Sequence, residues 1–168
     1  MAVNAITTEF ASRLAPMFKA KGFRKTSATW RRDCDRLTQV FNIQKSQWGD
    51  QFYLNLGIYL RGLGNESRPT EYRCHVRCRA ERLLEDEELQ TLRECLDFDT
   101  PLDREKRYLQ LEEIVANRVL PWFEDHTTPE SVGTTLRKGT AGFAIMRGTP
   151  ELLGFEMRRQ RFVPDPRR

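Results

Sequence analysis

The chain has 168 residues, of which 39% are hydrophobic and 31% are charged. This composition is typical of one soluble globular domain, and it excludes a low-complexity chain or a small scaffold that depends on disulfide bonds. No apolar run approaches the roughly 20 residues that a membrane-spanning helix needs, so we expect no membrane partner. The N-terminus has neither the basic region nor the apolar stretch of a signal peptide, which predicts a cytoplasmic protein.

The formal net charge is +4, and most of it lies at the C-terminal end of the chain. Residues 156–168 carry five arginines against two acidic residues. The rest of the chain is nearly neutral, whereas strong nucleic-acid binders usually carry a larger positive excess. We predict a single domain over residues 1–168, with a folded core at residues 1–162 and a basic flexible tail at residues 163–168.

The cysteines are Cys34, Cys74, Cys78 and Cys95. In a reducing cytoplasm we expect them to be free and mostly buried thiols. Cys74 and Cys78 flank His75, a pattern that raises the question of a zinc site. In a strand, however, the two cysteines would point to one face and the histidine to the other, and no second pair with ligand spacing follows. We therefore predict neither a metal site nor a cofactor.

Apolar residues recur at three- and four-residue spacing over residues 7–21, as in Phe10, Leu14 and Phe18. This spacing predicts an N-terminal helix with one buried face. Pro16 lies inside the pattern, and it is expected to kink the helix or to split it into two short pieces.

Alternation of apolar and polar residues over residues 51–61 is the clearest secondary-structure signal in the chain. Its apolar row is unbroken: Phe52, Leu54, Leu56, Ile58 and Leu60. We predict a strand there, paired in an antiparallel hairpin with residues 36–46 across a turn at residues 47–50. Further strands are predicted at residues 28–32 and 72–80, which gives a four-stranded antiparallel meander.

After residue 80 the hydrophobic period changes from that of a strand to that of a helix. Helices are predicted over residues 84–96, 102–124 and 129–138. Asp103 is a plausible cap of the second helix, Pro121 is expected to end or kink it, and residues 140–147 could form a helix or a strand. Strands followed by helices indicate an α+β fold, with the C-terminal helices packed on the apolar face of the sheet.

The polar face of this sheet is the main candidate for a functional surface, because amides, phenols and guanidinium groups bind phosphates, bases and acidic protein surfaces. The candidate binding residues are Asn42, Gln44, Lys45, Ser46, Trp48, Tyr53, Asn55, Tyr59, Arg73, His75, Arg77 and Arg79. Strict alternation aims Lys45 at the opposite face, so its presence in the set requires a bulge or a side chain that bends past the sheet edge. Two other interpretations stay open: an ordinary solvated face, or a face buried under the C-terminal helices.

Several short motifs in the first half of the chain follow one another in a recognisable order. They are Gly22-Phe23-Arg24-Lys25, Trp30-Arg31, Gln44-Lys45-Ser46, Trp48-Gly49 and Phe52-Tyr53-Leu54-Asn55-Leu56-Gly57, followed by Cys74-His75-Val76-Arg77-Cys78-Arg79. In this order they resemble a bacterial family catalogued as domain of unknown function 4304. The resemblance implies a bacterial single-domain protein. Because the family has no established activity, the resemblance transfers no catalytic residue.

No motif in the chain is a specific catalytic signature, so we expect a domain that acts by binding, with another protein as its partner. Its small size suits an immunity- or antitoxin-like role, by analogy with other small bacterial domains. An alternative is an RNA- or phosphate-binding module that uses Arg73, Arg77 and Arg79 on the polar face. A second alternative is a small enzyme with His75 as its general base. Trp48, at the hairpin turn, is expected either to contact a partner or to fold back on the domain.

Overall fold

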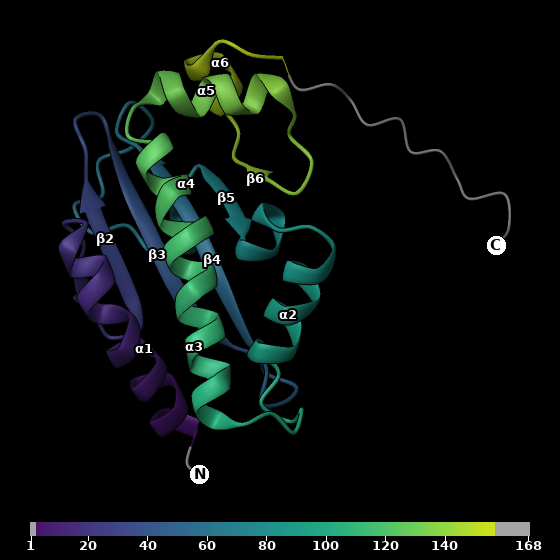
Figure 1. The fold of residues 1–168 in the computed structure, drawn as a ribbon. Helices are drawn as coiled ribbons and strands as arrows, with labels where there is room; N and C mark the ends of the chain where they lie inside the picture. Colours follow the sequence, from purple (N-terminus) through teal and green to yellow (C-terminus); the bar gives the residue numbers. More distant parts are fainter. Residues whose placement is uncertain (1–2, 157–168) are drawn as a thin grey trace, which may run out of the picture.

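Residues 3–156, the part of the chain that this computed structural model describes, form an antiparallel sheet with a layer of helices on one face (Figure 1). The sheet has six strands in chain order, β1 (Arg24–Thr26), β2 (Thr29–Asp33), β3 (Leu37–Lys45), β4 (Phe52–Leu60), β5 (Val76–Arg79) and β6 (Ala144–Ile145). The helices are α1 (Val3–Ala20), α2 (Asp86–Leu96), α3 (Arg104–Ile114), α4 (Leu120–Asp125), α5 (Pro129–Lys138) and α6 (Thr149–Leu153). Shorter turns are the 3-10 helices η1 (Glu71–Arg73) and η2 (Ala80–Leu83) and the π-helical segment η3 (Val115–Val119).

The α+β prediction is confirmed, but the meander has six strands rather than four. β1 has three residues and β6 has two, so neither is long enough to show hydrophobic alternation. β6 pairs with Val76 and Arg77 of β5, which brings the segment after the helices back to the sheet. The predicted tail at residues 163–168 lies outside the described residues. In the described part of the chain, no helix has the length and apolar character needed to cross a membrane.

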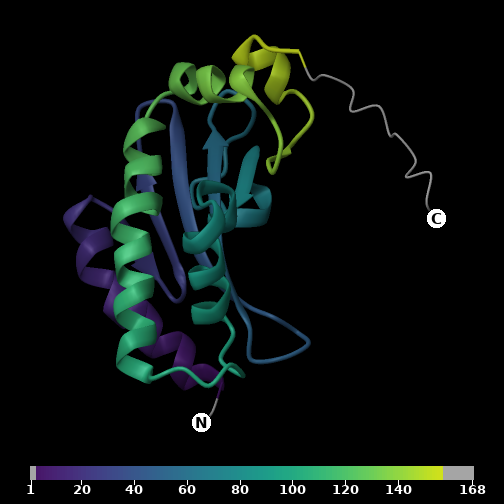
Figure 2. The same ribbon diagram turned by 45° about the vertical axis from the view of Figure 1, so that its right-hand side comes forward.

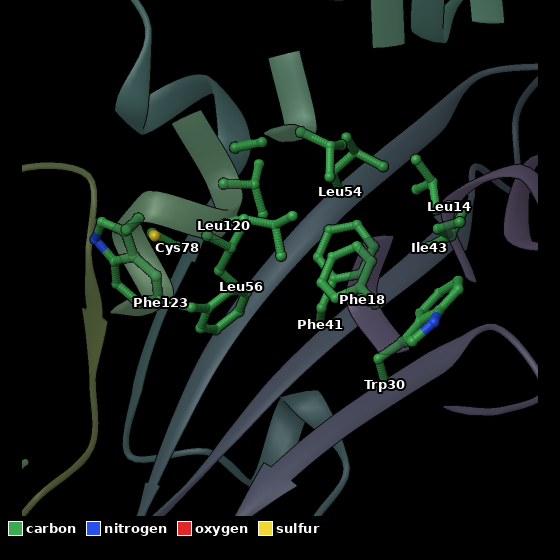
Figure 3. Close-up of a cluster of buried hydrophobic side chains, with 14 of the residues drawn as sticks. Leu14, Phe18, Trp30, Phe41, Ile43, Leu54, Leu56, Cys78, Leu120 and Phe123 are labelled. Carbon is green, nitrogen blue, oxygen red and sulfur yellow. The ribbon is translucent and has the colours of Figure 1, made fainter. Parts of the chain in front are cut away.

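The helices pack on the face of the sheet that carries the apolar row of β4 (Figures 1 and 2). At the centre of this core, the ring of Phe18 from α1 stacks on that of Phe41 from β3, with 4.5 Å between centroids (Figure 3). The predicted split of the first helix at Pro16 is wrong, since α1 is one continuous helix. Pro16 is exposed, so the backbone carbonyl that loses its partner faces water.

The predicted helix over residues 102–124 is present as α3, η3 and α4, which follow one another without a gap. The side chain of Asp103 accepts a hydrogen bond from the amide of Lys106, as expected of an N-cap. Pro121 does not end the helix. A proline ring normally meets the carbonyl four residues earlier, at Asn117, and that carbonyl belongs to the wider π-helical turn.

The predicted strand over residues 72–80 is shorter than expected, because the chain forms η1 before it enters β5. This turn breaks the alternation. Cys78 faces the helical core, whereas Cys74 packs with Val40 and Tyr59 on the opposite face of the sheet. The close approach of Cys74 to β4 explains a glycine in the middle of that strand, since a Cβ at Gly57 would lie 2.7 Å from the Cys74 Sγ.

Replacement of Gly57 by alanine is therefore expected to destabilise the domain by about 2 kcal/mol through overpacking. Gly139→Ala is the matched control, because this glycine also has an extended backbone and a Cβ there meets nothing within 4 Å. Urea unfolding followed by tryptophan fluorescence measures both changes. Equal stability of the two variants would contradict the close contact between β4 and Cys74.

Two polar side chains lie on the helical side of the sheet, inside the core. Gln39 is fully buried, and its Nε2 donates to the carbonyls of Phe123 and His126, at 2.6 and 2.8 Å. Arg107 is also buried, and its guanidinium lies within hydrogen-bonding distance of four backbone carbonyls between residues 94 and 100. Both groups donate to carbonyls at or just beyond helix ends, some of which also accept from a backbone amide, as that of Phe123 does from His126.

Candidate functional site

The face of the sheet away from the helices, which we call the outer face, carries most of the predicted binding residues. Cross-strand pairing sets one polar row from β2 to β5: Thr29, Asn42, Asn55 and Arg79. A second row pairs Gln44 with Tyr53, next to the β3–β4 turn. Arg77 lies on the same face, one pair further along β5 and opposite Gly57.

A loop over residues 61–75 crosses the outer face and covers one end of it. The amide of Glu66 in this loop donates to the hydroxyl of Tyr59, at 3.0 Å. Further across the sheet, the Nε of Arg31 donates to the carbonyl of Pro69, at 2.7 Å. The outer face is thus neither fully solvated nor covered by the C-terminal helices, the two alternatives that the sequence left open.

The uncovered end of the face is the one next to the β3–β4 turn. We call it the open strip and define it by Asn42, Gln44, Tyr53, Arg77 and Arg79 together with Asn55, whose own side chain is buried. Its side chains hold one another in place. The Nδ2 of Asn55 donates to the Oε1 of Gln44 at 2.8 Å, and the guanidinium of Arg79 lies 3.9 Å above the Tyr53 ring. Such contacts fix the direction of the remaining polar groups before a partner arrives.

A shallow pocket of about 260 Å³ opens in the strip, lined by Gln44, Asn55, Glu71, Arg77 and Arg79 together with Gly142 and Ala144. Burial raises the pKa of the Glu71 carboxyl above its usual range, although the charges of Arg77 and Arg79 act in the opposite direction. The pairing between these groups is loose, with 3.9 Å between the Arg77 Nη1 and the Glu71 Oε1. The Nε of Arg77 is buried and has no hydrogen-bond partner anywhere in residues 3–156.

One wall of this pocket comes from the C-terminal part of the chain. Arg82 holds the wall in place, since its Nε donates to the carbonyl of Ala141 and its guanidinium lies 5.1 Å from the Phe143 ring centroid. Gly142 between them has a φ of 75°, which favours glycine. The pocket is therefore completed by a segment far from β3, β4 and β5 in the sequence.

The family model described as a domain of unknown function (DUF4304) matches residues 14–125. The chain belongs to this family. The resemblance drawn from the motifs of the first half is thus confirmed, and the match extends further, through α3 and α4. No curated protein and no solved structure matches the chain. The match contains the whole open strip, whereas Gly142 and Ala144 lie beyond it.

Several predicted residues of this DUF4304 domain lie outside the open strip. Lys45 pairs with Phe52 in an unbroken register, so there is no bulge, and its ammonium reaches Asp50 at the sheet edge, at 2.8 Å. The Oγ of Ser46 accepts from the amide of Trp48 within the turn. Arg73 belongs to η1 and donates to a carboxylate oxygen of Glu66, and Tyr59 is buried under the loop.

Trp48 does not fold back on the domain: it is 94% exposed at the tip of the hairpin, which projects from the sheet (Figure 2). The tip itself is held in place. The carbonyl of Asp50 accepts from the amide of Phe98 at 2.9 Å, and Gln51 forms a β-bridge with Asp97. Trp48 is thus a large exposed side chain on a fixed support, next to the Gln44–Tyr53 end of the open strip.

His75 is buried and takes part in the packing of the sheet. Its Nδ1 accepts a hydrogen bond from the amide of Leu60 at 3.0 Å, and its ring packs against Tyr59 with 4.6 Å between centroids. Burial lowers its pKa, which favours the neutral ring. Within residues 3–156 no carboxylate forms a hydrogen bond with His75, so the geometry does not supply the partner that a catalytic base of this kind uses.

The outer face carries more positive charge than the polar residues of the strip alone suggest. Sequence reasoning missed Arg24, Arg31 and Arg68. Arg24 pairs with Arg31 across β1 and β2, and Arg68 belongs to the covering loop. The alternation of Trp30 and Arg31 is the signal that could have placed Arg31 on this face.

Proposed function

We propose that this DUF4304 chain is a bacterial cytoplasmic binding domain whose open strip recognises an acidic surface of another protein. The observation that carries this proposal is a charge imbalance. Five arginines lie on or beside the outer face without a hydrogen bond to any carboxylate of residues 3–156: Arg24, Arg31, Arg68, Arg77 and Arg79. Asp33 and Glu66, the acidic residues at the covered end, are already paired with Arg61 and Arg73.

This imbalance is compatible with the nearly neutral body of the chain, because the compensating acidic residues lie elsewhere. Asp86, Glu87 and Glu88 form the first turn of α2, in the helical layer on the other side of the sheet. Opposite charges on opposite faces give the outer face a positive potential that steers an acidic partner toward it.

A protein partner fits this surface better than RNA does. Single-stranded RNA needs exposed aromatic rings on which bases stack, but the Tyr53 ring is covered by Arg79 and Tyr59 is buried. Arginine, tyrosine and an exposed tryptophan are instead the side chains enriched at the energetic centres of protein interfaces. An immunity- or antitoxin-like role is one function of this kind, since it requires only that the domain bind and block another protein.

Site-specific photo-crosslinking tests the proposal in cells of the source organism. A benzoylphenylalanine at Tyr53 is expected to capture a protein partner. The matched control carries the same group at Leu109, which is 60% exposed on α3 in the helical layer. Capture from both positions, or from Leu109 alone, would overturn the assignment of the binding surface. Loss of capture when a ten-residue oligouridine is added to a lysate before irradiation would favour the RNA-binding alternative.

Variants of the purified domain then give the energetics of the complex. Trp48→Ala is expected to weaken binding by about 2 kcal/mol and Arg79→Glu by at least about 1.4 kcal/mol, or tenfold in Kd. Neither change should alter the unfolding midpoint much, because both side chains are exposed. Leu109→Ala serves as the control, and isothermal titration calorimetry measures all of them. Unchanged affinity for both strip variants would exclude the strip as the interface.

A further inference from the structure

The pocket in the open strip contains a donor that the protein itself does not satisfy. The Nε–H of Arg77 is removed from solvent, yet it has no acceptor among the described residues. Buried polar groups in folded proteins nearly always have a partner, so an orphaned donor beside a pocket indicates a group that binds there. The second guanidinium of the pocket, that of Arg79, is exposed and stacks on Tyr53, which leaves its N–H groups at the rim without an acceptor in residues 3–156.

An acceptor with two oxygens matches these two donors. Once the Arg77 side chain shifts enough to present its Nε–H to the pocket, a carboxylate can accept from it with one oxygen and from Arg79 with the other, which are charge-assisted bonds of the strong kind. The amide donors of Gln44, whose Oε1 is taken by Asn55, lie at the same pocket. The volume of about 260 Å³ is below the roughly 300–1,000 Å³ of sites for whole small molecules, and it suits one side chain.

Glu71 gives this pocket a second property. Its carboxyl is half-buried in the pocket wall, where its pKa is already raised by burial. A bound carboxylate would place a second negative charge beside it, and like charges at short range raise the pKa of one partner further. Proton uptake by Glu71 removes this repulsion and leaves both arginines to the ligand.

We propose that the pocket of Glu71, Arg77 and Arg79 binds an aspartate or glutamate side chain of the partner, and that Glu71 takes up a proton when this side chain binds. This proposal rests on the proposed function.

The other groups that face Glu71 do not change charge in the same range. Arg77 and Arg79 of β5 stay positive, and burial raises the pKa of the Cys78 thiol to about 12. Burial likewise raises the pKa of the Cys74 thiol in the loop that carries Glu71. β4 contributes Gly57, and residues 140–144 contain no titratable side chain. Affinity should therefore increase as the pH falls toward the pKa of Glu71, until the carboxylates of the ligand themselves become protonated near pH ~4.3.

NMR of the ¹⁵N-labelled domain provides a direct readout, because the Nε–H of Arg77 gives its own resonance. The probe is an acetylated and amidated hexaglutamate peptide, and the control probe is the hexaglutamine peptide of the same length. Hexaglutamate is expected to move the Arg77 Nε–H signal downfield, with an affinity that increases from about pH 8 to about pH 5, while hexaglutamine leaves the signal in place.

Matched variants separate the pocket from general charge. Arg77→Gln is expected to weaken hexaglutamate binding by at least about tenfold, whereas Arg73→Gln should change it less than about twofold. Both variants lose one positive charge on neighbouring segments, but Arg73 is paired with Glu66 and does not line the pocket. Glu71→Gln should bind about tenfold more tightly than the wild type near pH 7.5 and lose the pH dependence. Arg79→Gln, with Arg77 Nε–H as the reporter, replaces Arg77→Gln if that variant does not fold.

Several outcomes would overturn the proposal. Equal losses in Arg77→Gln and Arg73→Gln would show attraction by overall charge rather than a pocket. A larger shift with inorganic phosphate than with hexaglutamate would make the ligand class wrong, and an unchanged pH profile in Glu71→Gln would exclude the proton uptake. A partner captured at Tyr53 without any response of the Arg77 signal would refute the carboxylate pocket and leave the binding function standing. Failure of capture at Tyr53 together with a normal hexaglutamate response would refute the proposed binding function and leave the carboxylate pocket standing.

Discussion

Replacement of Arg107 by alanine is expected to lower the free energy of unfolding by about 4 kcal/mol, because hydrogen bonds from a charged group to buried acceptors contribute roughly 1.5–3 kcal/mol each. Its Nη1 lies 2.7–3.0 Å from the carbonyls of Glu94, Cys95 and Asp97, and its Nη2 lies 2.6 Å from that of Thr100. These carbonyls belong to the end of α2 and the loop that follows. Alanine would remove this donor from all four carbonyls, although that of Asp97 keeps the amide of Thr100.

Chemical denaturation with guanidinium measures this loss of unfolding free energy, and two further variants serve as controls. Arg104→Ala removes an exposed arginine from the same helix, which pairs with Glu9, and it should cost less than about 1 kcal/mol. Arg107→Lys should recover less than half of the loss, because an ammonium cannot reach carbonyls on two sides as a planar guanidinium does. A cost below about 1 kcal/mol for Arg107→Ala would contradict the network of bonds around it.

The same variant should affect the proposed interface. The loop that Arg107 holds contains Asp97 and Phe98, which bond to the strand end and the turn that carry Trp48. Loss of Arg107 therefore loosens the support of Trp48 without touching that side chain. A weaker complex in a variant that is still folded would reflect this loss of preorganisation.

The second large effect is expected for Gln39→Leu, which should destabilise the domain by about 3 kcal/mol even though leucine fills a similar volume. The carbonyl of His126 would lose its donor, and the Arg32 Nε would lose the Gln39 Oε1 that accepts from it at 2.8 Å. Both are then desolvated polar groups without this partner, whereas the carbonyl of Phe123 keeps the bonds from the His126 amide and the Arg32 Nη2.

Gln47→Leu provides the control for this prediction, since it makes the same substitution at an exposed position of the β3–β4 turn. It should change stability by less than about 0.5 kcal/mol. Thermal unfolding followed by circular dichroism compares the two variants, and native-state hydrogen exchange should show that α4 opens first in Gln39→Leu. Equal unfolding temperatures for the two variants would mean that Gln39 contributes little to the attachment of α4.

The elements that could be predicted from sequence are those whose signal is local. The alternation of residues 51–61 is a property of one strand, and it correctly indicated the hairpin and the buried row. The helix over residues 129–138 was bounded correctly, because Thr128 caps it through a bond with the amide of Ser131 and Gly139 ends it. β1 could not be predicted, and at residues 140–147, which contain β6, the sequence left helix and strand open, since such short strands exist only through their neighbours.

The site was predictable in part for the same reason. The side-by-side placement of Asn42, Asn55, Gln44 and Tyr53 follows from strand pairing alone. The path of the 61–75 loop does not, because it depends on long-range contacts such as that between Arg31 and Pro69. That path buries Tyr59 and brings Glu71 into the pocket, neither of which a pattern within the loop could show. The burial of Arg107 could not be predicted either, because in the sequence it looks like a surface residue of a charged helix. Only its contacts with the end of α2 show that it is buried.

Because β6 returns to β5 from the C-terminal part of the chain, the residues of the pocket are synthesised at different times. The strands and arginines of the open strip leave the ribosome early, but the wall at Gly142 and Ala144 leaves it only after α5 has been made. Pairings between segments far apart in sequence also close late in folding, because the intervening chain must first be ordered. A nascent chain therefore exposes the arginines before it has a pocket, and the selectivity proposed for that pocket arises only after residues 142–144 have been made.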